Sequence, residues 1–281
     1  MKKPSVSIVI PTFNRASTIE RSVKSVLEQT FDDIEVIVVD DGSTDDTEEV
    51  MSKFSDSRIK YLKQSNAGAC AARNKGIDNS SGQYIAFQDS DDFWHPDKLE
   101  KQLLNIEAEN SDFDICFMNS VFPNGDKRLI PSKKAIKAGL SSRSILESNF
   151  ISTQMILAKR SVFDSIRFDE RLPRFQDWDL GIRMINAYKM SVTKESLVDQ
   201  YILSDSITTN PQKAMIAFSI LESKYCDLLK ANKKEYSIFL RRKVSSCKDL
   251  LSKQEIQCIY RKSLSINFNI KSFVKLVLSF L

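Results

Sequence analysis

Short apolar runs alternate with segments of helical periodicity along the first hundred residues of the chain. The runs at 6–10, 34–39 and 84–87 are rich in β-branched or aromatic residues, and the run at 34–39 is apolar on both faces. Such runs are typical of strands in a covered sheet. A weaker run lies at 58–62, and apolar residues recur at helical spacing at 17–29. This alternation predicts an α/β fold, with a mostly parallel sheet and helices on both faces.

Helix-start signals agree with this pattern. Ser17 can cap the first helix, and Ser43 or Thr44 can cap the second. The first turn of that second helix is acidic, which suits the positive end of a helix dipole. We expect a third helix at 69–78 and a fourth that opens with Pro96 at its favoured first position.

The pattern loosens after about residue 113. The segment at 120–148 is polar and irregular, whereas the chain from residue 211 onward has the spacing of several amphipathic helices. Between these parts we expect strands at 114–119 and 150–158, and helices at 159–166 and 177–189.

Charge divides the chain more clearly than composition does. The 281 residues are 42% hydrophobic and 28% charged, which suits one large domain with an appendage. Residues 211–281 have 14 basic and 5 acidic side chains, so their net charge is +9 and that of residues 1–210 is −5. We therefore expect an α/β domain at 1–210 and a basic helical region at 211–281, whose partner is an anionic surface.

Residue types and spacing exclude several functional classes. The five cysteines form no CxxC pair and His95 is the single histidine, so zinc-type spacing and a Cys–His catalytic pair are absent. Scattered cysteines suit a reducing compartment. The first apolar run is too short for a signal peptide and is broken by Pro11, and no stretch reaches the roughly 18 apolar residues of a membrane span. We therefore expect a cytoplasmic protein, soluble or peripherally attached.

An acidic cluster follows the strand at 84–87. Asp89, Asp91 and Asp92 lie in the stretch IAFQDSDDFW. Carboxylates this close repel one another unless a cation lies between them, and a hard divalent ion takes oxygen ligands while keeping waters and substrate phosphates. The alternative is a helix cap and a solvated turn before Pro96, and these residues alone leave both readings open.

A second acidic pair, Asp40 and Asp41, ends the strand at 34–39 in the stretch VVDDGSTDDT. A carboxylate here could accept a hydrogen bond from a base edge or a ribose hydroxyl. The alternative is turn chemistry, which explains Gly42 and Ser43 well.

Small residues mark the third stretch, SNAGACAARNKG, where Arg73 and Asn74 supply donors. The stretch lacks the glycine patterns of dinucleotide-binding and P-loop sites. A helix that opens at such a loop could still face a diphosphate. The alternative is a helix packed closely through its alanines.

The fourth stretch, RFQDWDLGIRM, has two carboxylates at the start of a helix. Asp179 suits helix capping, whereas Asp177, a second carboxylate far from the acidic cluster, is what a general base requires. Trp178 could stack on a sugar or pack as a buried aromatic.

Five motifs follow one another along the chain: VSIVIPTFNR, IVVDDGSTDDT, NAGACAARNKG, YIAFQDSDDFW and FQDWDL. In this order they resemble the family 2 glycosyltransferases of the GT-A fold, of the type that builds bacterial surface polysaccharides. Each motif alone is weak, but five in the right order are specific. The resemblance extends from Ser5 to Tyr201.

The resemblance implies a nucleotide-sugar site over the ends of the first strands. Asp41 would contact the base, usually uracil, and Arg73 would lie near the nucleotide or the diphosphate. The other residues implied for the nucleotide-sugar are Pro11, Phe13, Asn14 and Asp91.

The resemblance also implies a divalent cation, Mg²⁺ or Mn²⁺, bound by Asp91 and Asp92 in a DxD-type motif. Because Asp89 is acidic too, the register is either Asp89-x-Asp91 or the pair Asp91–Asp92. The cation would bridge the diphosphate and stabilise the charge that builds up on the leaving group.

Asp177 matches the family's catalytic base in an ED motif, although Gln176 takes the place of the Glu. The implied reaction inverts the anomeric centre, so an α-linked UDP-sugar gives a β-linked product. The implied acceptor is a growing glycan of an O-antigen or capsule, linked to polyprenyl diphosphate. Nucleic acid is not an expected partner.

Other functions compete with this one. Within enzymes, the donor nucleotide or the acceptor could differ. A catalytically silent module that binds nucleotide-sugars is the main alternative, and the presence of Asp91, Asp92 and Asp177 argues against it. A phosphate-accepting receiver built on Asp40 and Asp41 would leave these other carboxylates unexplained, in a chain too long for it.

The last segment, IKSFVKLVLSFL at 270–281, is apolar except where Lys271, Lys275 and Ser279 recur at helical spacing. It is too short to span a bilayer but could lie in its surface. We expect it to attach the protein to the cytoplasmic face of the inner membrane. The alternatives are a helix that completes the core and a dimer contact.

Overall fold

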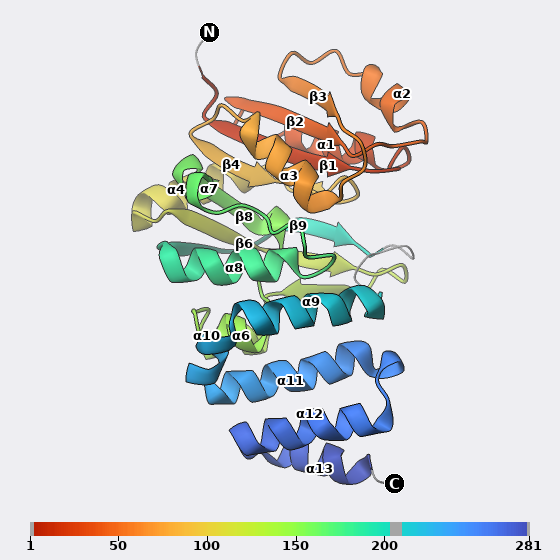
Figure 1. Ribbon diagram of the computed structural model, residues 1–281. Helices are drawn as coiled ribbons and strands as arrows, with labels where there is room; N and C mark the ends of the chain where they lie inside the picture. The colour runs from red at the N-terminus through yellow and green to blue at the C-terminus, as the bar shows by residue number, and fades with distance from the viewer. Residues whose placement is uncertain (1–2, 203–209, 280–281) are drawn as a thin grey trace.

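The computed structural model describes residues 3–202 and 210–279 of the chain. An α/β body occupies the first part, and the helices from Pro211 onward stack below it in Figure 1. This arrangement confirms the predicted fold class, an α/β sheet with helices and a helical C-terminal region.

Four parallel strands form the first half of the sheet, in the order β3-β2-β1-β4. The chain moves outward from β1 to β3 and then returns to β4, so the strand order reverses between β1 and β4. Ligands bind at the carboxyl ends of the strands beside such a reversal. The strands are β1 (Val6–Thr12), β2 (Ile34–Asp40), β3 (Ile59–Lys63) and β4 (Tyr84–Phe87).

The crossover helices α1 (Ile19–Leu27), α2 (Thr47–Ser52) and α3 (Ala69–Asp78) cover both faces of this half. Right-handed crossovers place α1 and α2 on one face and α3 on the other, because the chain direction reverses before β4. Helix α3 approaches the sheet very closely: a Cβ added at Gly76 would lie 2.2 Å from Cγ1 of Val9. The close approach seats α3 directly on β1.

The second half of the sheet brings in antiparallel pairs. Strand β8 runs antiparallel to both β4 and β6, whereas β6 and β9 are parallel. Its strands are β5 (Phe93–Trp94), β6 (Phe113–Val121), β7 (Lys127–Ile130), β8 (Ile156–Lys159) and β9 (Met190–Tyr201). Its helices are α4 (Lys98–Glu109), α5 (Lys133–Ala138), α6 (Ser144–Glu147), the one-turn η1 (Thr153–Met155), α7 (Arg160–Ser165) and α8 (Gln176–Ala187).

Several element predictions were wrong in this half. Pro96 does not open α4, because the preceding residues pair with β9 as β5 and the His95 N–H donates to the Leu197 carbonyl. Of the strand expected at 150–158, only the end forms a strand, β8, because Thr153–Met155 form the one-turn η1. Neither β9 nor the elements within 120–148 were predicted. In the first half, the predicted caps also differ: Thr18 precedes α1 and Asp46 precedes α2, neither with a side-chain cap.

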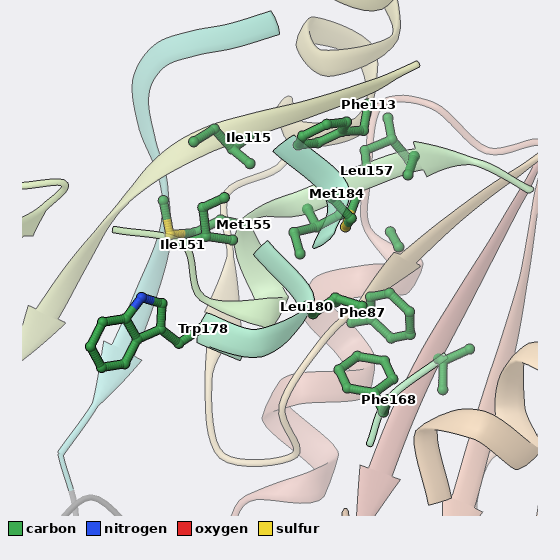
Figure 2. Close-up of a cluster of buried hydrophobic side chains, with 14 of the residues drawn as sticks. Phe87, Phe113, Ile115, Ile151, Met155, Leu157, Phe168, Trp178, Leu180 and Met184 are labelled. Carbon is green, nitrogen blue, oxygen red and sulfur yellow. The ribbon is translucent and has the colours of Figure 1, made fainter. Parts of the chain in front are cut away.

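Helix α8 is held by a large apolar cluster (Figure 2). Leu180 and Met184 of α8 are buried in the same cluster as Phe87 and Leu157 of the sheet, whereas Trp178 is buried against Phe218 and Phe239 of the C-terminal helices. This packing fixes the start of α8 relative to the end of β4.

A buried ionic network joins α8 to the C-terminal helices. Asp179, fully buried, accepts hydrogen bonds from Arg183 Nε at 3.0 Å and from the Tyr225 hydroxyl at 2.7 Å, and pairs with Lys224 at 2.7 Å. The expected capping role of Asp179 is thus replaced by an inter-helix contact.

The C-terminal region is helical, as predicted, and its helices pack one upon the next. Helix α11 packs on α9, α12 on α11 and α13 on α12, so α13 is farthest from the sheet in Figure 1. Within the described residues, no helix has the length and apolar character to cross a membrane. The helices are α9 (Pro211–Lys224), α10 (Cys226–Ala231), α11 (Lys233–Cys247), α12 (Lys253–Ile266) and α13 (Ile270–Leu278), with the one-turn η3 (Lys248–Leu250).

We predict that Gly76→Ala lowers the free energy of unfolding. The added methyl overlaps Val9, and overpacking of this kind costs about 1–3 kcal/mol, more than the gain in helix propensity of up to about 1 kcal/mol. Urea denaturation measures the change. The control on the same helix is Asp78→Ala, an exposed residue that pairs with Arg167, for which we expect a change within about 0.5 kcal/mol. An unchanged or raised urea midpoint for Gly76→Ala would contradict the close packing.

Candidate active site

The end of β1 is tied to the loop after β2. Asn14 adopts a left-handed conformation, with φ of 50°, and its N–H donates to Ser43 Oγ at 2.9 Å. Its side-chain carbonyl accepts from the Thr44 N–H at 2.8 Å. Of the other residues expected here, Pro11 is buried within β1, whereas Phe13 is 44% exposed at the rim. The rim of the expected nucleotide site is therefore a rigid pair of loops.

Asp41 shapes the loop that precedes α3. Its carboxylate accepts hydrogen bonds from the N–H groups of Ala67 and Gly68, both at 2.8 Å, and from Gln64 at 2.7 Å. Gly68 has φ of 93°, a conformation that favours glycine. Asp41 is buried and already holds this loop. A base could reach only a remaining lone pair of its oxygens.

Asp40 stabilises the turn after β2, which was the alternative to a contact with the nucleotide. Its carboxylate accepts from the Ser43 N–H at 2.8 Å and from the hydroxyl of Tyr61. Both bonds lie within the protein, so the second strand's two acids stabilise the loops around the strand end.

Arg73 and Asp89 form an ion pair beside the end of β4. The guanidinium NH2 of Arg73 donates to Asp89 Oδ1 at 2.7 Å, and its carbon lies 5.4 Å from the centroid of the Phe168 ring. Burial opposes the charge on Arg73, but the charge of Asp89 prevails and raises the arginine pKa. The pair holds the guanidinium of Arg73 in place near the carboxyl end of β4, with Asp89 balancing its charge.

The three acids of the cluster face different surroundings. Asp92 is buried, and it accepts from Gln154 Nε2 at 2.6 Å and from the Tyr201 N–H at 2.9 Å. Burial, and then the charges of Asp89 and Asp91, raise the pKa of Asp92 well above its usual range. Asp91 is 23% exposed, with Oδ2 at 3.4 Å from Arg15 Nε. Burial and the neighbouring charges thus oppose ionisation of Asp92, whereas its two hydrogen bonds favour it.

The donor set fits a divalent cation that is shared with a ligand. Within the described residues, no three or more His, Cys, Asp or Glu side chains are grouped to hold a metal by themselves. Mg²⁺ needs only one or two carboxylates when waters and substrate phosphates complete its coordination. Asp91 is open enough to supply one, with Asp89 beside it, whereas both oxygens of Asp92 already accept hydrogen bonds. Of the two registers, the geometry favours Asp89-x-Asp91.

Asp177 lies at the start of α8, where Phe175 precedes the helix with φ of 63°. Burial raises the pKa of Asp177 to about 6. The Trp178 N–H at 2.8 Å, the side chain of Asn149 and the charge of Arg73 oppose this rise, and the charge of Asp89 adds to it. A carboxyl with this pKa is poised to exchange protons near neutral pH.

The fold therefore brings together charges from three separate motifs. Arg73 comes from α3, Asp89 from the loop after β4 and Asp177 from α8, and each acts electrostatically on the others. Trp178 does not face this site: it is buried, and its indole N–H donates to the Ile145 carbonyl at 2.6 Å. His95 lies elsewhere, 3.6 Å from Asp199, with its ring partly exposed.

Some polar residues of the site had no motif to reveal them. Asn149 lies in the loop after α6, and Gln154 lies in η1, where a strand was expected. Gln88, directly before the acidic cluster, is fully buried, and neither amide atom bonds to any described residue; the same holds for Thr12 Oγ1. Buried polar atoms without partners at one strand edge indicate where ligand or water atoms lie. The sequence contained one signal for Gln88: its polar amide directly follows the apolar strand at 84–87.

The comparisons with known proteins agree with this geometry. The family described as Glycosyl transferase family 2 matches the chain over residues 7–167. An Escherichia coli protein described as UDP-Glc:alpha-D-GlcNAc-diphosphoundecaprenol beta-1,3-glucosyltransferase WfgD is 46% identical over 213 residues, which are 75% of this chain and 82% of that protein. Three Rickettsia glycosyltransferases are 34–35% identical, but the chain spans only 29–31% of their length.

Solved structures share the fold. Staphylococcus aureus TarS 1-349 in complex with UDP-GlcNAc has a TM-score of 0.71 at 19% identity, covering 98% of this chain and 79% of that one. The mannosyltransferase PcManGT of Pyrobaculum calidifontis, in complex with GDP-Man and Mn²⁺, has a TM-score of 0.61 at 16% identity, covering 99% and 85%. The family match, the identity to WfgD and the order of the motifs agree: the chain belongs to glycosyl transferase family 2.

Proposed function

We propose that the chain transfers a sugar from a UDP-sugar to a hydroxyl group of a growing glycan, with inversion of the anomeric centre. The observation that carries this proposal is the environment of Asp177. It is a carboxyl with a pKa of about 6, held beside the Arg73–Asp89 pair at the carboxyl ends of the parallel strands. A proton acceptor next to a fixed cation is what transfer from a diphosphate donor requires.

On the donor side, the nucleotide would lie along Pro11, Phe13 and Asn14, with its base near Asp41. Arg73 would attract the diphosphate. UDP is the proposed nucleotide because WfgD is described as using UDP-Glc, and the TarS structure holds UDP-GlcNAc. The PcManGT structure holds GDP-Man, so the same fold also accepts another nucleotide.

A Mg²⁺ or Mn²⁺ ion would be held by Asp91, with Asp89 beside it as the second ligand in place of Asp92, whose two oxygens already accept hydrogen bonds. When bound, it would stabilise the negative charge that develops on the leaving diphosphate. Asp92 would support the cation site indirectly, because the hydrogen bonds it accepts from Gln154 and Tyr201 hold the acidic loop in place.

Asp177 would act as the general base. Its ionised carboxylate takes the proton of the acceptor hydroxyl as the oxygen attacks the anomeric carbon from the face opposite the diphosphate. One carbon–oxygen bond forms while the bond to the diphosphate breaks, so an α-linked donor gives a β-linked product. The raised pKa makes the carboxylate a stronger base than an ordinary aspartate.

The proposed acceptor is a polyprenyl-diphosphate-linked oligosaccharide of a surface polysaccharide. WfgD is described as acting on alpha-D-GlcNAc-diphosphoundecaprenol, and its 46% identity to this chain is the support for this choice. Such an acceptor would place the protein at the cytoplasmic face of the membrane. We propose that residues 1–210 form the transferase domain and residues 211–281 a membrane-facing region.

We predict that Asp177→Asn abolishes sugar transfer while UDP-sugar binding survives. General-base catalysis contributes about 10²–10⁴-fold, and an amide cannot take the proton. Radiolabelled sugar transfer measures the loss, and a thermal shift with the UDP-sugar measures binding. The matched control is Asp164→Asn, at an exposed position on α7. Near-normal turnover of Asp177→Asn would refute the base assignment.

The pH dependence gives a second prediction. Because the pKa of Asp177 is raised to about 6, kcat/KM should fall as the pH drops through about 6, where the base becomes protonated. The side chain of Asn149 lowers this pKa, so Asn149→Ala should move the acid limb to higher pH. Asn105→Ala, which removes a similar hydrogen bond to Asp114, is the control and should leave the limb in place. An acid limb that Asn149→Ala leaves in place would argue against Asp177 as the titrating group.

The donor and the cation can be tested together. We predict that one UDP-sugar raises the unfolding temperature only with Mg²⁺ or Mn²⁺ present, because the cation joins the diphosphate to Asp91. The screen should include UDP-glucose, UDP-galactose, UDP-N-acetyl sugars and dTDP- and GDP-sugars, each repeated with EDTA. Asp91→Ala should lose the metal-dependent shift, and Asp126→Ala, in the turn before β7, should keep it. A shift that is equal with EDTA would exclude the cation.

A further inference from the structure

Helix α13 has its polar side turned toward the rest of the protein. Ser272 is its one fully buried residue among those described, and Ser272 Oγ lies 3.0 Å from Ser263 Oγ of α12. Arg241 of α11 donates to Ser272 Oγ at 3.3 Å and to Asn269 Oδ1 at 3.0 Å. The Asn269 amide donates to Ser237 Oγ at 2.9 Å. Hydrogen bonds, rather than apolar packing, hold this helix in place.

The apolar side of α13 faces outward. Ile270 is 74% exposed, Phe273 49% and Leu278 59%. Together with Val274 and Val277, which are also exposed, they recur at i, i+3, i+4, i+7 and i+8, the spacing of one continuous helical face. In a helix that completes a core this face points inward. Here it lacks a cover among the described residues.

Positive charge borders the apolar face. Lys271 and Lys275, one turn apart, are both exposed and lie along one side of it. From Ile256 to Leu281 the sequence has no acidic residue and four basic ones, namely Lys271 and Lys275 of α13 and Arg261 and Lys262 of α12. Lys262 pairs with Glu222 of α9 at 2.8 Å, whereas the stretch from 256 to 281 offers no acidic side chain to neutralise Lys271 and Lys275. The partner of this surface must be apolar and anionic at once.

We propose that α13 lies in the surface of a bilayer that contains anionic lipid. Phe273, Val274, Val277 and Leu278 enter the acyl region, and Lys271 and Lys275 meet the lipid phosphates. A nine-residue helix is about 14 Å long, too short to span the bilayer but long enough to lie along it. The inference extends the proposed function, because it rests on a lipid-linked acceptor to explain why the enzyme sits at a membrane.

A second copy of the chain fits this surface less well. In a symmetric dimer through α13, the lysines of one copy would lie near those of the other, and like charges repel. A stable protein interface also takes about 20–30 residues a side, which one nine-residue helix does not supply. An anionic bilayer satisfies both the charge and the apolar face.

Flotation of the full chain with vesicles tests the proposal. The chain should bind phosphatidylcholine vesicles that contain phosphatidylglycerol, bind pure phosphatidylcholine far less, and be released by salt. Phe273→Ser combined with Val277→Ser should weaken binding about tenfold or more. Lys271→Gln and Lys275→Gln should each weaken it about fivefold. The matched control is Leu104→Ser with Ile216→Ser, at exposed apolar residues of α4 and α9, which should bind as the parent does.

Failure of this proposal and failure of the proposed function give different results. The thermal shift with UDP-sugar, measured on the same variants, reports the donor site and should stay unchanged. Normal vesicle binding by the Phe273/Val277 variant, or equal binding to neutral and anionic vesicles, would overturn the proposal. Sedimentation gives the third outcome: a dimer that this variant splits, without any vesicle binding, would assign the face to a second copy instead.

Discussion

The partly buried ion pair between Arg73 and Asp89 is the contact around which the candidate site is built. It joins the helix that packs on β1 to the loop that follows β4, across the point where the strand order reverses. In such a setting an unpaired charge is costly, so each partner keeps the other in place. Asp177 is held within the field of this pair by a separate cluster of apolar side chains.

The same pair explains how a chain tolerates three acids in four residues. Asp89 is neutralised by Arg73, and burial favours the uncharged form of Asp92. The remaining carboxylate, Asp91, is more exposed than Asp92 and therefore easier for a ligand to reach. It lies near Arg15. The cluster is therefore three different environments rather than one pool of negative charge.

The strongest sequence patterns predicted the fold class. The helix at 69–78 and the strand at 84–87 were predicted with the bounds that the structure has. Strand β9 could not be predicted, since exposed Lys194 and Glu195 interrupt its pattern where the ladder with β6 shifts register. The antiparallel half depends on long-range pairing, which local periodicity does not encode.

Within the site, residue type was a better guide than role. Carboxylates at strand ends indicated the region of the candidate site. The sequence could not show which of them accept hydrogen bonds from the protein's own loops, as Asp40 and Asp41 do. The internal partners of Asp92 and Asp177, Gln154 and Asn149, come from a stretch without periodicity. Such contacts are set by tertiary packing.

The bond from the Tyr201 N–H to Asp92 has a mechanical consequence. Tyr201 ends β9, the last strand before the C-terminal helices, and Arg21 lies over its ring at 4.0 Å while donating to the Asp91 carbonyl. The acidic loop and the end of β9 are thus clamped to each other. A displacement of the acidic loop would therefore also displace the end of β9, because the two share these contacts.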